Sequence, residues 1–350
     1  MPVTPAPAAS RPTGRSGRAS WLGPALLAGV FTAALTFVSL ALPRWLATFA
    51  ARWIDIPDLH PAIEPDAIDA FVATHHLHLV GGAALAVSVA LIVLGLLTRR
   101  RTPAVLGALL VWLPTFGAFA AAMFFLAGLG SLRLLWLPLW PEAMALGDIA
   151  YLPYMVLVWP PWQLGVDLRG AVTIAAIASG LGLFILATAT WLRTRWSGKQ
   201  GLLTTGVYRW SRHPQYLGWI LWTYGMTLLA AREPVPMAGE NPGTMLAWVL
   251  STLVVVGVAL VEEGHLVTAH GAAYRDYRER TALLVPLPGA VRRALQAPLR
   301  VTSALDPRAS GWRLVAALVL ELAVVVLLSL PFALADWPPG PAPWATWPGW

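Results

Sequence analysis

The chain has 350 residues, of which 57% are hydrophobic and only 12% are charged, and its mean hydropathy is +0.65. Soluble domains carry about twice this charged fraction, so the composition indicates an integral membrane protein and excludes a soluble globular one. The net charge of +7 comes mainly from arginines in short segments beside apolar runs, which favours an orientation signal over nucleic-acid binding. The absence of cysteine excludes disulfides, thiol nucleophiles and thiolate metal sites.

Residues 1–20 are rich in proline, alanine, serine and arginine, which predicts a disordered tail. Beyond them, apolar segments of about 20 residues, the length that a bilayer requires, recur along the chain. Tryptophans gather near the ends of these segments, as in interfacial belts. We therefore predict an all-α fold, a polytopic transmembrane helical bundle of about seven spans. The predicted spans are 21–42, 77–98, 104–129, 170–192, 215–231, 244–261 and 312–335.

The topology depends on residues 131–168, which are apolar but contain several prolines and acidic residues. This stretch is compatible with one kinked span or with a re-entrant or interfacial segment. If it does not cross, most basic residues lie on the cytoplasmic side, as the positive-inside rule demands. We therefore expect a protein of the cell membrane with a cytoplasmic N-terminus, and we interpret the arginines at 99–101 as part of this orientation signal.

Four regions follow from this pattern. We expect a cytoplasmic tail at 1–20, an N-terminal transmembrane bundle at 21–168 and a catalytic region at 169–290. Residues 291–350 supply a linker, the final transmembrane helix and a tail rich in proline and tryptophan.

The stretch Gly206–Gly218 combines charge with the start of an apolar segment. Arg212 and His213 stand where charge is costly to desolvate. Pro214 follows at the position where a helix would begin, and its missing N–H costs nothing there. Flanking rings that can stack or donate hydrogen bonds come from Tyr208 and Tyr216. A basic loop that merely flanks the membrane is the alternative.

A second polar block, which begins at Glu262 and Glu263, closes the apolar segment 244–261. A short loop joins that segment to the preceding one, so the two should fold as an antiparallel hairpin. The hairpin would bring Arg212 and His213 close to the two glutamates at one membrane face. The four charges form either a structural ion-pair clamp or a site for a polar, zwitterionic ligand.

Together the blocks resemble the isoprenylcysteine carboxyl methyltransferase and phospholipid methyltransferase superfamily of membrane enzymes. The resemblance rests on an Arg-His-Pro-x-Tyr-x-Gly block, then a glutamate pair and a Gly-x-x-Tyr-x-x-Tyr element, and it covers roughly residues 170–290. It implies S-adenosylmethionine as the cofactor, held at the matching positions. These positions are Arg212, His213, Pro214, Tyr216, Gly218, Glu262 and Glu263.

We add four neighbouring residues to the predicted cofactor site, Tyr208, His270, Tyr274 and Tyr277. On a helix, Tyr274, Tyr277 and Arg278 share one face, which suits either a cover over the site or interfacial anchoring. We assign the catalytic roles to Arg212 and Glu263. If the acceptor is an amine, Glu263 or His213 is the candidate base.

The resemblance implies methyl transfer to a lipid-like or lipidated acceptor, with a carboxylate, amine or thiol as the methylated group, at the cytoplasmic membrane face. Two alternatives stay open. One is an NADPH-dependent membrane reductase of the sterol-reductase type. The other is a non-enzymatic membrane protein in which the two blocks form only an ion-paired helical hairpin. The long N-terminal addition and the helix at 312–335 depart from the family, which leaves the acceptor unassigned.

Two further polar groups carry weaker signals. Histidines at 60, 75, 76 and 78 lie near acidic residues, but their spacing matches no specific metal site, so we predict no metal. Glu321 lies inside the last apolar segment, where pairing with another helix or a functional role would explain it.

Overall fold

The computed structural model describes residues 21–50, 52–53, 70, 73–112, 145–198, 201–232, 245–306 and 309–334. In these ranges every regular element is a helix, which confirms the all-α prediction for this part of the chain. The long helices are α1 (Leu22–Ala50), α3 (Leu77–Leu97), α4 (Arg101–Trp112), α8 (Leu152–Gln163), α9 (Arg169–Trp196), α10 (Pro214–Arg232), α11 (Met245–Arg280) and α14 (Gly311–Leu334). Shorter ones are η2 (Ala145–Tyr151), η3 (Gly206–Arg209), α12 (Gly289–Leu295) and α13 (Ala297–Val301).

Four of the described helices are long and apolar enough to cross a membrane, so the protein is an integral membrane protein. The segments are Leu77–Leu97, Arg169–Trp196, Met245–Arg280 and Gly311–Phe332, and shorter apolar helices cover Leu22–Val38 and Arg101–Val111. The predicted count of seven spans is not confirmed. The predicted tails at 1–20 and 336–350, and most of the predicted span 104–129, lie outside the described residues.

Two predicted segments differ from the described helices. The span predicted to end at residue 261 continues through the glutamate pair to Arg280, because the segment contains no proline and its backbone leaves helical geometry only at Gly271. Within the stretch 131–168, α8 has 12 residues and is about 18 Å long, which is shorter than the hydrocarbon core. The predicted orientation and the division into four regions stay predictions.

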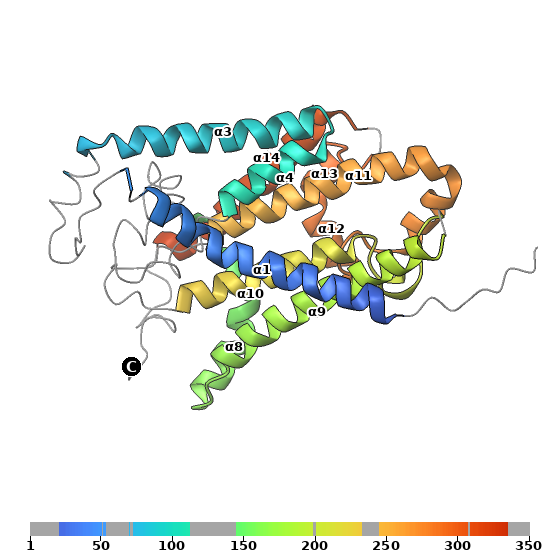
Figure 1. The fold of residues 1–350 in the computed structure, drawn as a ribbon, viewed down its shortest axis with the longest axis horizontal. Coiled ribbons are helices and arrows are strands. Elements are labelled where there is room, and N and C mark those ends of the chain that lie inside the picture. Colours follow the sequence, from blue (N-terminus) through green and yellow to red (C-terminus); the bar gives the residue numbers. More distant parts are fainter. Residues whose placement is uncertain are drawn as a thin grey trace, which may run out of the picture.

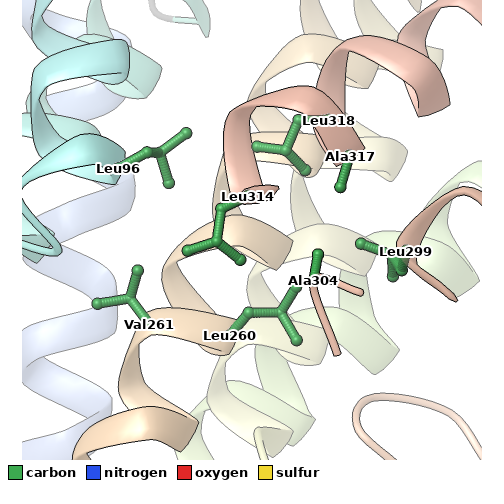
Figure 2. Close-up of a cluster of buried hydrophobic side chains, with 8 residues drawn as sticks. All are labelled: Leu96, Leu260, Val261, Leu299, Ala304, Leu314, Ala317 and Leu318. Carbon is green, nitrogen blue, oxygen red and sulfur yellow. The ribbon is translucent and has the colours of Figure 1, made fainter. Parts of the chain in front are cut away.

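Helix α11 runs through the middle of the bundle, with α3 and α4 on one side and α9 and α10 on the other (Figure 1). The part of α11 that directly precedes Glu262 packs into a buried apolar cluster with α3, α13 and α14 (Figure 2). The cluster consists of Leu96, Leu260, Val261, Leu299, Ala304, Leu314, Ala317 and Leu318. Since Leu260 and Val261 directly precede the two glutamates, this cluster fixes the position of the polar block on α11.

Glycines bring α9 and α10 into close contact. A Cβ added to Gly180 would lie 2.2 Å from the backbone nitrogen of Trp222, and one added to Gly218 would lie 2.6 Å from that of Phe184. Gly225 meets Ile177 in the same way, at 2.7 Å. Small residues at such crossings let backbones approach, which is how membrane helices gain packing energy without a hydrophobic driving force.

The close crossing predicts that substitution of two glycines on α9 will affect stability differently. Gly180→Ala should destabilise the protein by about 1–3 kcal/mol, because the added methyl group forces the two backbones apart. Gly182→Ala is the matched control, since a Cβ there meets no atom within 4 Å. The midpoint of thermal unfolding in detergent would measure both variants, and equal midpoints would contradict this account of the crossing.

Candidate functional site

The first polar block is held by the chain that follows α11. Ser211 and Ala282 form an isolated parallel β-bridge. The backbone N–H of Arg212 donates to the carbonyl oxygen of Ala282 at 2.9 Å, and that of His213 donates to Leu283 at 3.2 Å. Helix α10 then begins at Pro214, as predicted. The positions of Arg212 and His213 are therefore set by residues about 70 positions later in the chain.

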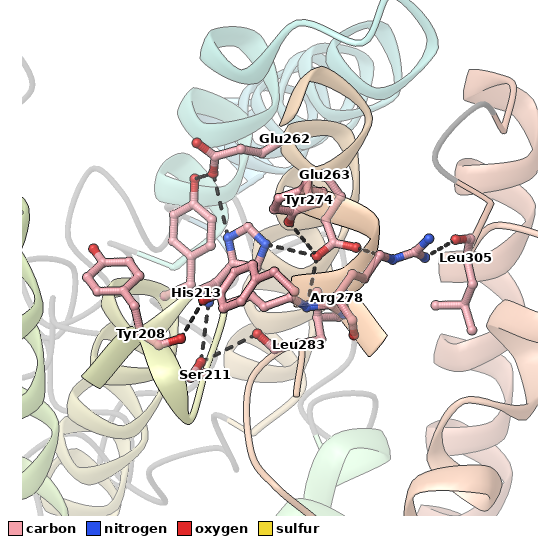
Figure 3. Close-up of polar contacts among 12 residues, drawn as sticks. Tyr208, Ser211, His213, Glu262, Glu263, Tyr274, Arg278, Leu283 and Leu305 are labelled. Atoms are coloured by element: carbon pink, nitrogen blue, oxygen red, sulfur yellow. Dashed lines mark hydrogen bonds and ion pairs between the residues drawn. The ribbon is translucent and has the colours of Figure 1, made fainter. Parts of the chain in front are cut away.

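Glu263 is the centre of the ion-pair network, and its side chain is only 1% exposed (Figure 3). Its Oε1 lies 3.0 Å from Nε of Arg212, and its Oε2 lies 2.9 Å from Nε of Arg278. The hydroxyl of Tyr274 donates to Oε1 at 3.0 Å, and Nε2 of His213 lies 3.5 Å from the same oxygen. A carboxylate this deeply buried needs such partners to remain charged.

Glu262 belongs to a second, more exposed group of contacts, and its side chain is 26% exposed. The hydroxyl of Tyr216 donates to its Oε2 at 2.9 Å, and Nη1 of Arg101 lies 2.8 Å from its Oε1. Nδ1 of His213 lies 3.7 Å from Oε2, and the rings of His213 and Tyr216 are stacked with centroids 5.4 Å apart. The predicted approach of Arg212 and His213 to both glutamates is confirmed.

Arg101 has a contact that the sequence did not indicate. It lies in the arginine run that we interpreted as an orientation signal, yet it pairs with Glu262 across 161 residues. Its neighbour Arg99 donates from Nη1 to the carbonyl oxygen of Ala309 at 2.8 Å. Only the packing of α3 and α4 against α11 and α14 brings these groups together.

A break in α11 turns the second polar block back over the site. Gly271 has φ 55° and ψ −125°, a conformation that is essentially restricted to glycine. Beyond this break, Tyr274 reaches Glu263, and the Tyr277 hydroxyl donates to the backbone oxygen of Tyr208. The two tyrosine rings pack edge to face with centroids 5.9 Å apart. The shared face of the helix therefore contacts the site, as one of the two sequence interpretations expected.

A cavity of about 170 Å³ lies between the two blocks. The predicted residues that line it are Tyr208, Arg212, His213, Pro214, Tyr216, Glu262, His270, Tyr274 and Tyr277. Gly218 and Glu263 are outside its lining: Gly218 packs against α9, and Glu263 is buried behind Arg212. Lining residues that sequence reasoning missed are Trp191, Thr194, Arg195, Gly201, Leu202, Leu203, Gln215 and Leu266. The basic end of α9 was the available signal for Arg195.

The lining suits a ligand with both charge signs. Glu262 supplies a carboxylate, while Arg195, Arg212 and the imidazoles of His213 and His270 supply donors. Burial, reinforced by Glu262, raises the pKa of the Tyr208 phenol, so that Tyr208 stays a neutral hydrogen-bond donor. Four tyrosine rings offer faces to a cation or to a planar ring.

Two other predictions concern polar groups outside this cavity. His60 and its acidic neighbours lie outside the described residues, and within the described ranges no three metal-ligating side chains gather. The absence of a metal stays a prediction. Glu321 makes no ion pair with any residue in the described part of the chain.

Comparison with known proteins matches the region that carries both blocks. Residues 180–281 match a family model described as "Protein of unknown function (DUF1295)". The chain is also similar, over part of its length, to curated methyltransferases. It is 30% identical over 86 residues to protein-S-isoprenylcysteine O-methyltransferase of Tribolium castaneum, which covers 24% of this chain and 27% of that protein.

Two further relatives carry the same name. The Saccharomyces cerevisiae enzyme is 29% identical over 96 residues, which is 27% of this chain and 36% of that protein. The Xenopus laevis enzyme is 29% identical over 91 residues, which is 26% of this chain and 28% of that protein. The chain therefore matches about a third or less of the length of these relatives. No solved structure matches. The predicted resemblance to isoprenylcysteine methyltransferases is confirmed, as a distant similarity over part of the chain.

The ion-pair network predicts unequal roles for the two glutamates in stability. Glu263→Gln should destabilise the protein by about 3–5 kcal/mol, because it leaves two guanidinium groups without their buried carboxylate. Glu262→Gln should cost about 1 kcal/mol or less, since its ion pair with Arg101 is exposed to solvent. Thermal unfolding in detergent measures both changes, and a larger loss for Glu262→Gln would contradict the assignment.

Proposed function

We propose that the protein is an S-adenosylmethionine-dependent methyltransferase that acts on a lipid-like or lipidated acceptor at the cytoplasmic face of the cell membrane. One observation carries the proposal. The two polar blocks line a single cavity and lie within residues 180–281, which match the family model, in a chain that is similar over about a quarter of its length to protein-S-isoprenylcysteine O-methyltransferases. The arrangement by itself is also compatible with an ion-paired hairpin, so the cavity rather than the ion pairs supports an enzyme.

The chemistry of the lining fits this cofactor. S-adenosylmethionine carries a carboxylate, an ammonium group, a sulfonium cation and an adenine ring, and it supplies an activated methyl group. Arg195 and His213 suit the carboxylate, Glu262 suits the ammonium group or ribose hydroxyls, and the tyrosine rings suit the sulfonium or adenine. His270, Arg212, Pro214 and the remaining predicted lining residues complete the proposed site.

For Arg212 and Glu263, we propose that catalysis depends on positioning. Glu263 uses both carboxylate oxygens within the network, so it fixes Arg212, Arg278 and Tyr274 rather than reaching into the cavity. Arg212 in turn contributes to the lining. Methyl transfer is an in-line displacement, which demands orientation and the exclusion of water more than acid–base chemistry.

Proton removal is needed only for some acceptors. A carboxylate or thiolate acceptor requires no base, whereas a protonated amine must first lose a proton. Between the two predicted bases, His213 is the better candidate because it lines the cavity and carries the lone-pair chemistry of imidazole. Trp191, Leu202 and Leu266 give the cavity an apolar part, which suits an acceptor with a hydrocarbon chain.

Calorimetric titration of the detergent-purified protein tests the cofactor. S-adenosylmethionine and S-adenosylhomocysteine should bind, and NADPH should not. Glu262→Gln should weaken their binding about tenfold or more, because a charged partner becomes neutral. Asp276→Asn is the matched control, since Asp276 is exposed and outside the cavity lining.

The outcomes separate the candidate functions. Binding of NADPH alone would favour the reductase alternative. A folded sample that binds none of the three compounds would leave the ion-paired hairpin as the better account. Equal affinity in Glu262→Gln and the unmodified protein would remove Glu262 from the proposed site.

A further inference from the structure

A second cavity, of about 360 Å³, adjoins the first at Arg212. It lies where the end of α11 meets the segment that contains α12 and α13. Its lining residues are Arg212, Arg275, Arg278, Glu279, Thr281, Ala282, Leu283, Arg292, Gln296, Arg300 and Leu305. Five arginines and one carboxylate therefore surround one space.

The charge of this arginine cavity is not neutralised within the described residues. Arg212 and Arg278 pair with Glu263. By contrast, Arg275, Arg292 and Arg300 have no carboxylate within ion-pair distance in the described part of the chain. Only Glu279 offsets them in the lining. Guanidinium groups that converge on a cavity form the donor arrangement that recognises phosphate.

The segment beside the cavity has the composition of a membrane-surface element. Its apolar side chains at Val291, Leu295 and Val301 are exposed, the last to 77%. Arginines alternate with them on α12 and α13. Exposed apolar groups next to arginines are typical of helices that lie in the headgroup region. Leu299 and Ala304 anchor the segment in the buried cluster against α14 (Figure 2).

We propose that the arginine cavity binds a phosphate group, and that the anionic headgroup of a membrane phospholipid supplies it. Arg275, Arg292 and Arg300 contact the phosphate, and the exposed apolar side chains of the α12–α13 segment lie among the acyl chains. Juxtamembrane arginine clusters gain affinity for anionic lipid in this way. This site shares Arg212 with the proposed cofactor cavity but is otherwise lined by different residues, and its assignment does not depend on methyl transfer.

The test uses the full-length protein in a neutral detergent. Short-chain phosphatidylglycerol, short-chain phosphatidylcholine and glycerol 3-phosphate are titrated separately, with the thermal unfolding midpoint as the readout of binding. Phosphatidylglycerol should raise the midpoint more than the other two compounds. The double variant Arg292→Gln/Arg300→Gln should weaken its binding about 30-fold.

The matched control is Arg280→Gln/Arg293→Gln, which removes the same charge from exposed positions outside the cavity lining. It should retain the affinity of the unmodified protein. If glycerol 3-phosphate and phosphatidylglycerol bind equally well, and only the Arg292→Gln/Arg300→Gln variant loses this binding, the cavity binds phosphate. That result would overturn the proposal that a lipid supplies the phosphate. Equal losses in both double variants, or equal binding of phosphatidylcholine, would overturn the site. Unfolding midpoints without ligand identify any variant that fails to fold, and Arg275→Gln then replaces the double variant.

Discussion

Burying the carboxylate of Glu263 without partners would cost several kcal/mol, and the surrounding structure meets this constraint with groups from two separate places in the chain. Arg212 comes from the segment before α10, whereas Arg278 and Tyr274 come from beyond the break in α11. A different feature of the backbone places each of these two segments beside Glu263. The β-bridge at Ser211 positions Arg212, and the conformation of Gly271 positions Tyr274 and Arg278, so both are needed to pair Glu263. The cavity lies between the two segments that they position.

The two cavities share Arg212, whose position is held by its ion pair with Glu263. The first cavity is lined by charges of both signs and by aromatic rings, whereas the second is lined by five arginines and one carboxylate among neutral side chains. The first lining therefore suits a zwitterionic ligand, and the second suits an anionic one. Close packing at the glycines of α9 and α10 fixes the position of α10, which begins at Pro214, directly after His213.

The sequence predicted the meeting of Arg212 and His213 with the glutamates because charges at the ends of two consecutive apolar segments must come together when the segments fold back. It did not predict the partnership of Arg278 with Glu263. That contact requires a sharp reversal at Gly271, whereas the i, i+3, i+4 pattern of Tyr274, Tyr277 and Arg278 gives only the face that they share beyond it. Nor did it predict Arg101, whose pairing depends on how α4 packs against a helix 161 residues away. Gly218, grouped with the cofactor residues by its motif, lies against Phe184 at the helix crossing.

The separation of the partners along the chain also orders the biogenesis of the protein. Arg212 leaves the ribosome well before Arg278, which follows 66 residues later, and Glu263 emerges between them. During synthesis, therefore, Arg212 and His213 emerge before the carboxylate that pairs with them in the folded protein. The carboxylate can leave water only after α11 has been inserted and its end has turned back at Gly271. Closure of the polar site is thus a late step, which keeps the charged groups hydrated until the apolar helices around them are already in the bilayer.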